Sequence, residues 1–227
     1  MSKKILRQIS VFFYLLILVI PLYTVLQNTG DLTRFWDPTP EPGEITYFFL
    51  RVAGLYAFVL LFLQIIIGAW MPYWTKLFPK IFLFHETQGL LTYGFLFAHP
   101  LFFLVNNFFT IGVFAPLSLL FTNFSNIREL YISLGKIAFV LLTIGVFAAY
   151  FRHKPFLNRH WRKFHILNYI AFWLAFFHSL NIGSDARTYP MSLVYPITGA
   201  LVALSIIQRL IPGRVYSWFR KWLPQLS

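Results

Sequence analysis

The sequence predicts an all-α membrane protein of six transmembrane helices, in a single domain over residues 1–227. Hydrophobic residues make up 58% of the chain, charged residues only 11%, and the mean hydropathy is +0.66. Several apolar runs also reach the length of about 20 residues that a helix needs to cross roughly 30 Å of hydrocarbon. Because backbone polar groups in lipid need internal partners, runs this long and continuous predict helices.

Six runs meet this criterion, and they leave little chain for a separate soluble domain. The predicted spans are Ile9–Leu26, Leu50–Met71, His85–Val105, Ile132–Phe151, Phe164–Ile182 and Met191–Ile211. The first run follows a basic start, as a signal peptide would. It is long enough to span and no small-residue cleavage pattern follows it, so we expect a retained helix.

Three longer connections separate these spans. Asn28–Thr46, with three prolines and Gly43, predicts an external loop rich in turns. Asn106–Glu129 predicts a second external loop, whose apolar part is too short to span and is expected at the membrane interface. Arg152–Lys163 predicts a short, strongly basic internal loop.

The net charge of +12 is distributed unevenly, and the distribution predicts topology. The residues that fall on one side are Lys3, Lys4, Arg7, Lys76, Lys80, Arg152, Lys154, Arg159, Arg162, Lys163, Arg209, Arg214, Arg220 and Lys221. The other side carries Arg34, Arg51, Arg128, Lys136 and Arg187, with six of the seven acids. By the positive-inside rule both termini are cytoplasmic, in a multi-pass protein of the bacterial inner (plasma) membrane. The basic residues then face anionic lipid headgroups, and nucleic acid is not expected as a partner.

Four histidines interrupt the apolar runs: His85 and His99 in the third span, and His165 and His178 in the fifth. An ionisable side chain in a span costs about 2.5–3.5 kcal/mol unless it is partnered, so each is a functional candidate. Both spans run from inside to outside, so His85 lies level with His165, and His99 level with His178. Imidazole is an axial ligand of haem iron, and this arrangement predicts two stacked haems. The chain has no cysteine, so haem would be held non-covalently, as b-type.

The angular positions differ between the two spans. Fourteen residues fall about 40° short of four helical turns, so His85 and His99 share a face. Thirteen residues fall about 140° short, so His165 and His178 do not share one on an ideal helix. Either a local distortion such as a π-bulge corrects this, or the haems sit off the helix axis.

Two segments around these histidines carry a family resemblance: Leu83–Gly89 (LFHETQG) and His160–Tyr169 (HWRKFHILNY). With the histidine spacing, they resemble the transmembrane domain shared by ferric reductases and NADPH oxidases, over a core of about Arg51 to Asn181. The resemblance implies one haem on His85 and His165, a second on His99 and His178, and electron flow from the cytoplasm outward. It also implies that Arg51 lies near the outer haem, at a propionate or at the acceptor.

The resemblance also suggests partners. The chain contains no Gly-x-Gly-x-x-Gly motif, so we expect electrons from a cytoplasmic flavoprotein reductase, or from FAD, FMN or a quinol at the basic inner face. The acceptor would be a ferric chelate, oxygen or a periplasmic protein. The pattern His160-Trp161-x-x-x-His165 is also similar to the haem-binding membrane subunit of the periplasmic methionine sulfoxide reductase system. That branch typically lacks a histidine at the position of His85.

Two other interpretations remain open. Quinol cytochromes of the cytochrome b class also pair histidines about fourteen apart, normally on the second and fourth helices of a bundle. A channel or transporter could use the four histidines for protons or metal ions. Of the remaining arginines and lysines near the outer face, Lys136 and Arg187 are expected to extend to the interface.

Overall fold

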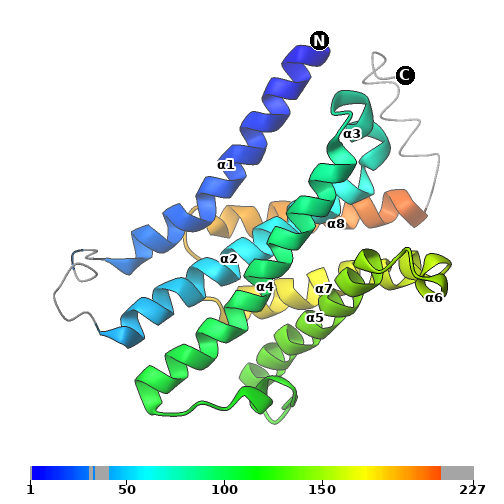
Figure 1. Ribbon diagram of the computed structural model, residues 1–227. Helices are drawn as coiled ribbons and strands as arrows, with labels where there is room; N and C mark the ends of the chain where they lie inside the picture. The colour runs from blue at the N-terminus through cyan, green and yellow to red at the C-terminus, as the bar shows by residue number, and fades with distance from the viewer. Residues whose placement is uncertain (1, 31–32, 34–40, 211–227) are drawn as a thin grey trace.

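A computed structural model of the chain describes residues 2–30, 33 and 41–210 and is helical over that part, without strands (Figure 1). The helices are α1 (Lys3–Thr29), α2 (Pro42–Ala69), α3 (Met71–Leu77), α4 (Ile81–Ile111), α5 (Ile127–Tyr150), α6 (Pro155–Asn158), α7 (Trp161–Ile182) and α8 (Met191–Leu210), with a 3₁₀ turn η2 (Pro116–Leu119). Five of the described helices, α1, α2, α4, α5 and α8, are long and apolar enough to cross a membrane. The chain is therefore a candidate multi-pass membrane protein.

Helix α7 corresponds to the predicted span Phe164–Ile182, but it does not qualify as a membrane span in the structure. It has 22 residues, which is long enough, but it is not among the five helices that meet the criterion of apolarity. Its sequence carries Arg162 and Lys163 at its start, and His165, Asn168 and His178 further along. These polar residues lower its hydropathy.

The predicted boundaries of the other helices need smaller corrections. Helix α2 begins at Pro42, well before Leu50, with proline in the first helical turn, where its missing N–H costs nothing. Helix α4 continues to Ile111, where the left-handed Gly112 ends it: the Gly112 N–H donates to the Phe108 carbonyl, and the Val113 N–H donates to the Asn107 carbonyl. The predicted loop Asn106–Glu129 is therefore shorter. The short helices α3 and α6 were not predicted.

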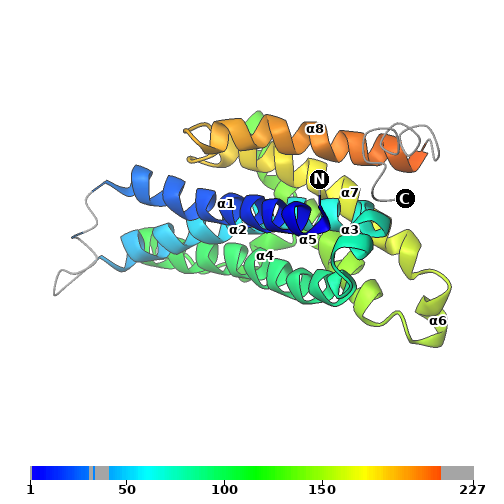
Figure 2. The same ribbon diagram turned by 90° about the horizontal axis from the view of Figure 1, so that it is seen from above.

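Helix α2 is the centre of the bundle. It is apolar on all sides and buried along most of its length, as expected for a core helix. It packs along α4, while α5 packs along α7, so the bundle contains two closely packed antiparallel helix pairs. Helix α8 covers α2 and α7 on the side away from α4 (Figure 2).

The start of α1, helices α3 and α6, and the end of α8 are spread over the same half of the molecule, on the right in Figure 2. We call it the basic end, because the described lysines and arginines predicted for one side of the membrane lie in these segments, in the connections next to them or at the start of α7. Contacts between chain segments tie it together: Arg7 donates to the Leu77 carbonyl, Glu86 pairs with Arg152, and Arg209 donates to the Gly68 carbonyl. The predicted residues Arg34, Arg214, Arg220 and Lys221 lie outside the described part of the chain.

Candidate functional site

The four histidines predicted as ligands meet in two pairs between α4 and α7. The outer pair is His99 and His178, with ring centroids 6.3 Å apart and ring planes at 74°. The inner pair, nearer the basic end, is His85 and His165, with centroids 6.3 Å apart and planes at 75°. The structure therefore brings together the partners that were predicted from their depths.

Helix α7 is a continuous α-helix through both of its histidines, so the predicted π-bulge is absent from it. The His165 and His178 side chains leave α7 in different directions, because thirteen residues are not a whole number of turns. Both pairs nevertheless close at the same separation. This corresponds to the predicted alternative in which the sites lie off the helix axis.

The separation of the rings is informative. Two imidazoles bound to opposite sides of one metal ion, with metal–nitrogen bonds of about 2.0–2.1 Å, have ring centroids roughly 6.3–6.5 Å apart. Both pairs match this value. Edge-to-face packing of aromatic rings also covers this distance, so the separation alone does not distinguish the two arrangements.

The outer pair is held by the backbone of the neighbouring helices. His99 Nδ1 lies 3.1 Å from the Leu50 carbonyl oxygen of α2, and His178 Nδ1 lies 2.9 Å from the Tyr131 carbonyl oxygen of α5. A carbonyl can only accept, so each Nδ1 carries the proton and donates it. The ring nitrogen that remains for a metal is Nε2, which is the support expected for a metal-binding histidine.

Side-chain amides contact both rings of the inner pair, and the Gly145 backbone of α5 also interacts with His165. The Gln64 amide nitrogen of α2 lies 3.2 Å from His85 Nε2 and donates to the His85 carbonyl at 2.8 Å. The Asn168 amide lies 3.3 Å from His165 Nδ1, one turn along α7. The Gln64 Oε1, Asn168 Oδ1 and His85 Nδ1 atoms are buried without a hydrogen-bond partner. Buried polar groups are nearly always satisfied, so these orphans point to a polar or metal-containing occupant.

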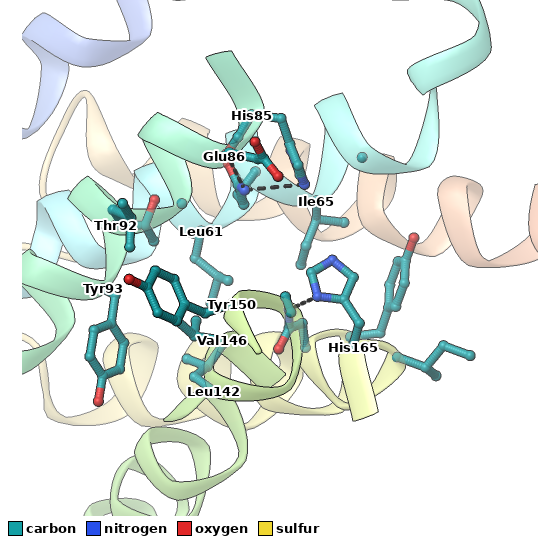
Figure 3. Close-up of a pocket in the computed structure, with 18 of the residues that line it drawn as sticks. Leu61, Ile65, His85, Glu86, Thr92, Tyr93, Leu142, Val146, Tyr150 and His165 are labelled. Atoms are coloured by element: carbon teal, nitrogen blue, oxygen red, sulfur yellow. Dashed lines mark hydrogen bonds between the residues drawn. The ribbon is translucent and has the colours of Figure 1, made fainter. Parts of the chain in front are cut away.

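A cavity of about 780 Å³ opens between the two rings of the inner pair. His85 and His165 lie on opposite sides of it, and Leu61, Leu142 and Val146 line its apolar part (Figure 3). Its volume falls within the range of about 300–1,000 Å³ that is typical of cofactor and ligand sites. The cations that line it, Arg152, Arg162 and Arg209, all come from the basic end of the bundle.

Arg51, predicted near the outer pair, forms an ion pair with Asp185. Its guanidinium forms a two-point ion pair with Asp185, from Nε to Oδ2 at 2.7 Å and from Nη2 to Oδ1 at 2.5 Å. Side-chain exposure is 10% for Arg51 and 3% for Asp185, so the pair is buried. Asn28 of α1 also donates to Asp185, at 2.7 Å. Arg51 therefore joins α1, α2 and the α7–α8 connection.

Other residues weighed from the sequence have structural partners. Lys136 donates to the Ser118 and Phe121 carbonyls at 2.7 Å and holds the α4–α5 connection, and Arg187 donates to the Leu180 carbonyl at 3.1 Å. Between the two histidine pairs, Phe172 is fully buried and stacks on Phe58 of α2, with centroids 5.6 Å apart.

Sequence reasoning missed two residues of the site, Gln64 and Asn168, and the partner of Arg51, Asp185. An amide inside an apolar run signals a polar contact, and Gln64 and Asn168 carry that signal in the sequence. Asp185 lies just beyond the predicted fifth span, where an acid is ordinary, so nothing in the sequence distinguished it.

Comparisons of the chain with known protein families, with curated proteins and with solved structures found no match. The functional assignment therefore depends on the geometry of the site.

Proposed function

We propose that this chain carries electrons across a membrane through two b-type haems, each ligated by one histidine of α4 and one of α7. The observation that carries the proposal is the pair of ring separations: both are 6.3 Å, with ring planes within one degree of the same angle. A single contact of this kind is ordinary packing. Two equal ones, from four intramembrane histidines at matching depths, favour a shared purpose.

The donor set favours haem over a metal ion held by protein alone. Among the described residues, no group of three or more histidines, cysteines or acids could hold a metal ion. Structural and catalytic zinc sites use three or four protein ligands, whereas haem iron already has four porphyrin nitrogens and needs two axial ligands. A pair of facing histidines is the set that haem requires.

The cavity at the inner pair also fits such a group. Its wall is apolar over Leu61, Leu142 and Val146, and Arg152, Arg162 and Arg209 line it at the basic end, where carboxylates would find cations. Ligation through His85 Nε2 requires the Gln64 amide or the imidazole to rotate, because they are 3.2 Å apart. Ligation through His165 Nε2 leaves Nδ1–H to donate to the Gly145 backbone or to the Asn168 amide oxygen, once that amide turns its oxygen to the ring.

A haem bound at each pair would supply one-electron redox chemistry. The four histidines orient their rings, and Phe58 and Phe172 fill the layer between the two sites and exclude water from it. The fully buried Phe172 is our candidate for the contact between the two cofactor edges.

The proposed membrane arrangement includes α7 as a sixth span, because both pairs need it between the same faces as α4. The basic end is then cytoplasmic, and the protein belongs to a bacterial inner membrane. A cytoplasmic flavoprotein, or FAD, FMN or a quinol at the basic end, would be the donor to the inner pair. A ferric chelate, oxygen or a periplasmic protein, including a methionine-sulfoxide-reductase-like partner, would accept electrons near the outer pair.

The direct test is haem content. The protein, expressed with supplemented haem and purified in detergent, should contain two b-type haems per chain in a pyridine haemochrome assay. Its reduced spectrum should have the sharp bands of bis-histidine ligation. One haem per chain would overturn the two-site proposal, and no haem would favour the transporter alternative.

Direction is tested separately, in vesicles of known orientation. A donor confined to the side of the basic end should reduce an impermeant ferric chelate on the opposite side. No reduction of the chelate by a protein that holds both haems would overturn the proposed route.

A further inference from the structure

Glycines of neighbouring helices face three of the four histidine rings. A Cβ atom built on Gly135 of α5 would lie 2.6 Å from His178 Nδ1, and one on Gly54 of α2 would lie 2.8 Å from His99 Nδ1. A Cβ on Gly68 of α2 would lie 3.0 Å from His85 Cε1. We call Gly54, Gly68 and Gly135 the backing glycines.

The spacing of the backing glycines follows the spacing of the histidines. Gly54 and Gly68 are fourteen residues apart on α2, as are His85 and His99 on α4. Because α2 and α4 pack antiparallel, Gly54 meets His99 at one end and Gly68 meets His85 at the other. The match places one glycine behind each histidine of α4.

The outer backing glycines also expose the carbonyls that hold the rings. Leu50 is four residues before Gly54, and Tyr131 is four residues before Gly135. In a helix the Cα–Cβ bond tilts toward the N-terminus, so a side chain covers the turn that precedes it. A side chain at position 54 or 135 would therefore cover the carbonyl that accepts from His99 or His178.

We propose that Gly54 and Gly135 are positioning residues for the outer metal site: each lets a histidine ring reach a backbone carbonyl, which fixes the proton on Nδ1 and directs Nε2 to the metal. Gly68 likewise leaves room for the His85 ring, but it does not give that ring access to a backbone carbonyl. This inference rests on the proposed function, because it treats the histidines as haem ligands. It adds which residues on α2 and α5 make the outer pair competent to bind.

The test compares Gly135→Ala, Gly54→Ala and Gly68→Ala in the full chain, with Gly94→Ala of α4 as the matched control. Gly94 has no atom within 4 Å of an added Cβ, so its variant should keep both haems and their midpoint potentials. Loss of a partner that orients a metal ligand typically costs about 10–100-fold in affinity. We expect a loss of that size at the outer haem for Gly135→Ala, a similar or smaller one for Gly54→Ala, and the smallest change, confined to the inner haem, for Gly68→Ala.

The spectroscopic readout separates positioning from general destabilisation. Any outer haem that remains in Gly54→Ala or Gly135→Ala should have altered low-spin EPR g-values and an altered potential, while the inner haem signals stay unchanged. Equal effects on both haems, or an unchanged outer haem, would overturn the inference. If the wild-type protein binds two haems and these variants do as well, only this inference fails and the proposed function stands.

A double-mutant cycle tests the inference even when a glycine variant folds poorly. Adding His178→Ala to Gly135→Ala removes the ring that the new Cβ would meet. With all variants prepared without haem, the double variant should therefore recover melting temperature relative to Gly135→Ala alone. Additive losses in the cycle would show that the glycine does not act through the ring.

Discussion

The outer and inner histidine pairs have the same ring separation but are held in place by different groups. At the outer pair, His99 and His178 each contact a backbone carbonyl, of Leu50 at 3.1 Å and Tyr131 at 2.9 Å. At the inner pair, amide side chains contact both rings, only His165 also interacts with a backbone group, that of Gly145, and three polar atoms there stay without a partner. A backbone carbonyl in a helix cannot rotate, whereas a glutamine or asparagine side chain can.

The difference indicates that the outer site is preorganised and the inner site adjustable. The two ends of the bundle also differ in how deeply their ion pairs are buried. The outer end is closed by the buried Arg51–Asp185 ion pair, with side-chain exposures of 10% and 3%. At the basic end the corresponding pair, Arg152–Glu86, is much more exposed, at 40% and 34%. Under the proposed function, the adjustable site lies at the end from which the donor approaches.

The largest expected effect is the loss of one haem when one of its histidine ligands is removed. His99→Ala or His178→Ala should abolish the outer haem and leave the inner one, and His85→Ala or His165→Ala should do the reverse, because each haem depends on both axial ligands. Pyridine haemochrome content and potentiometric titration would measure the loss. If His85→Ala and His99→Ala removed the same spectral component, the pairing by depth would be wrong.

The next largest effect is on the free energy of unfolding, and it differs between the ion pairs at the two ends of the bundle. Asp185→Asn leaves the Arg51 guanidinium buried without its counter-charge, which should cost about 3–5 kcal/mol in the free energy of unfolding. The matched variant Glu86→Gln at the basic end should cost about 0–1 kcal/mol, because its ion pair is partly exposed. Unfolding by denaturant in detergent would measure both. Equal costs would show that the outer end is not the more tightly closed one.

Substitutions of Asn168 test whether its amide sets the midpoint potential of the inner haem. Asn168→Asp should lower the midpoint potential of the inner haem, because a carboxylate that accepts from His165 Nδ1–H makes the imidazole a stronger donor to iron. Asn168→Leu removes the acceptor and should raise that potential. The outer haem serves as the internal control, because its ligand His178 is ten residues from Asn168, or about 15 Å along α7. Shifts of the same sign in both variants would contradict the role of the amide.

The smallest effect concerns the approach of a donor to the basic end. Neutralising the exposed residues Lys154, Arg159 and Lys163 should slow haem reduction by reduced FMN, which is anionic, roughly tenfold at low salt, within the range of electrostatic steering. Reduction by reduced riboflavin, which lacks the phosphate, should change little, and the difference should shrink as salt shortens the Debye length to about 8 Å. Equal rates for FMN in both proteins at low salt would mean that these residues only set topology.

Much of the fold follows from local features of the chain. Apolar runs of sufficient length predicted helices at the positions of α1, α2, α4, α5, α7 and α8, because span length depends only on consecutive residues. The pairing of His85 with His165 and of His99 with His178 was also predicted, because depth along a helix is counted in residues. The extra length of α2 and α4 was not, since it depends on their ends packing together.

The sequence by itself determined which residues lie at which depth, and therefore which histidines pair. The tertiary structure decided what supports them, namely the Leu50 and Tyr131 carbonyls and the backing glycines, and it also decided that Arg51 pairs with Asp185. The physical reason is that depth is set within one helix, whereas a contact between helices depends on how far each is rotated and shifted against its neighbour. That rotation results from packing along the whole interface, and no single motif encodes it.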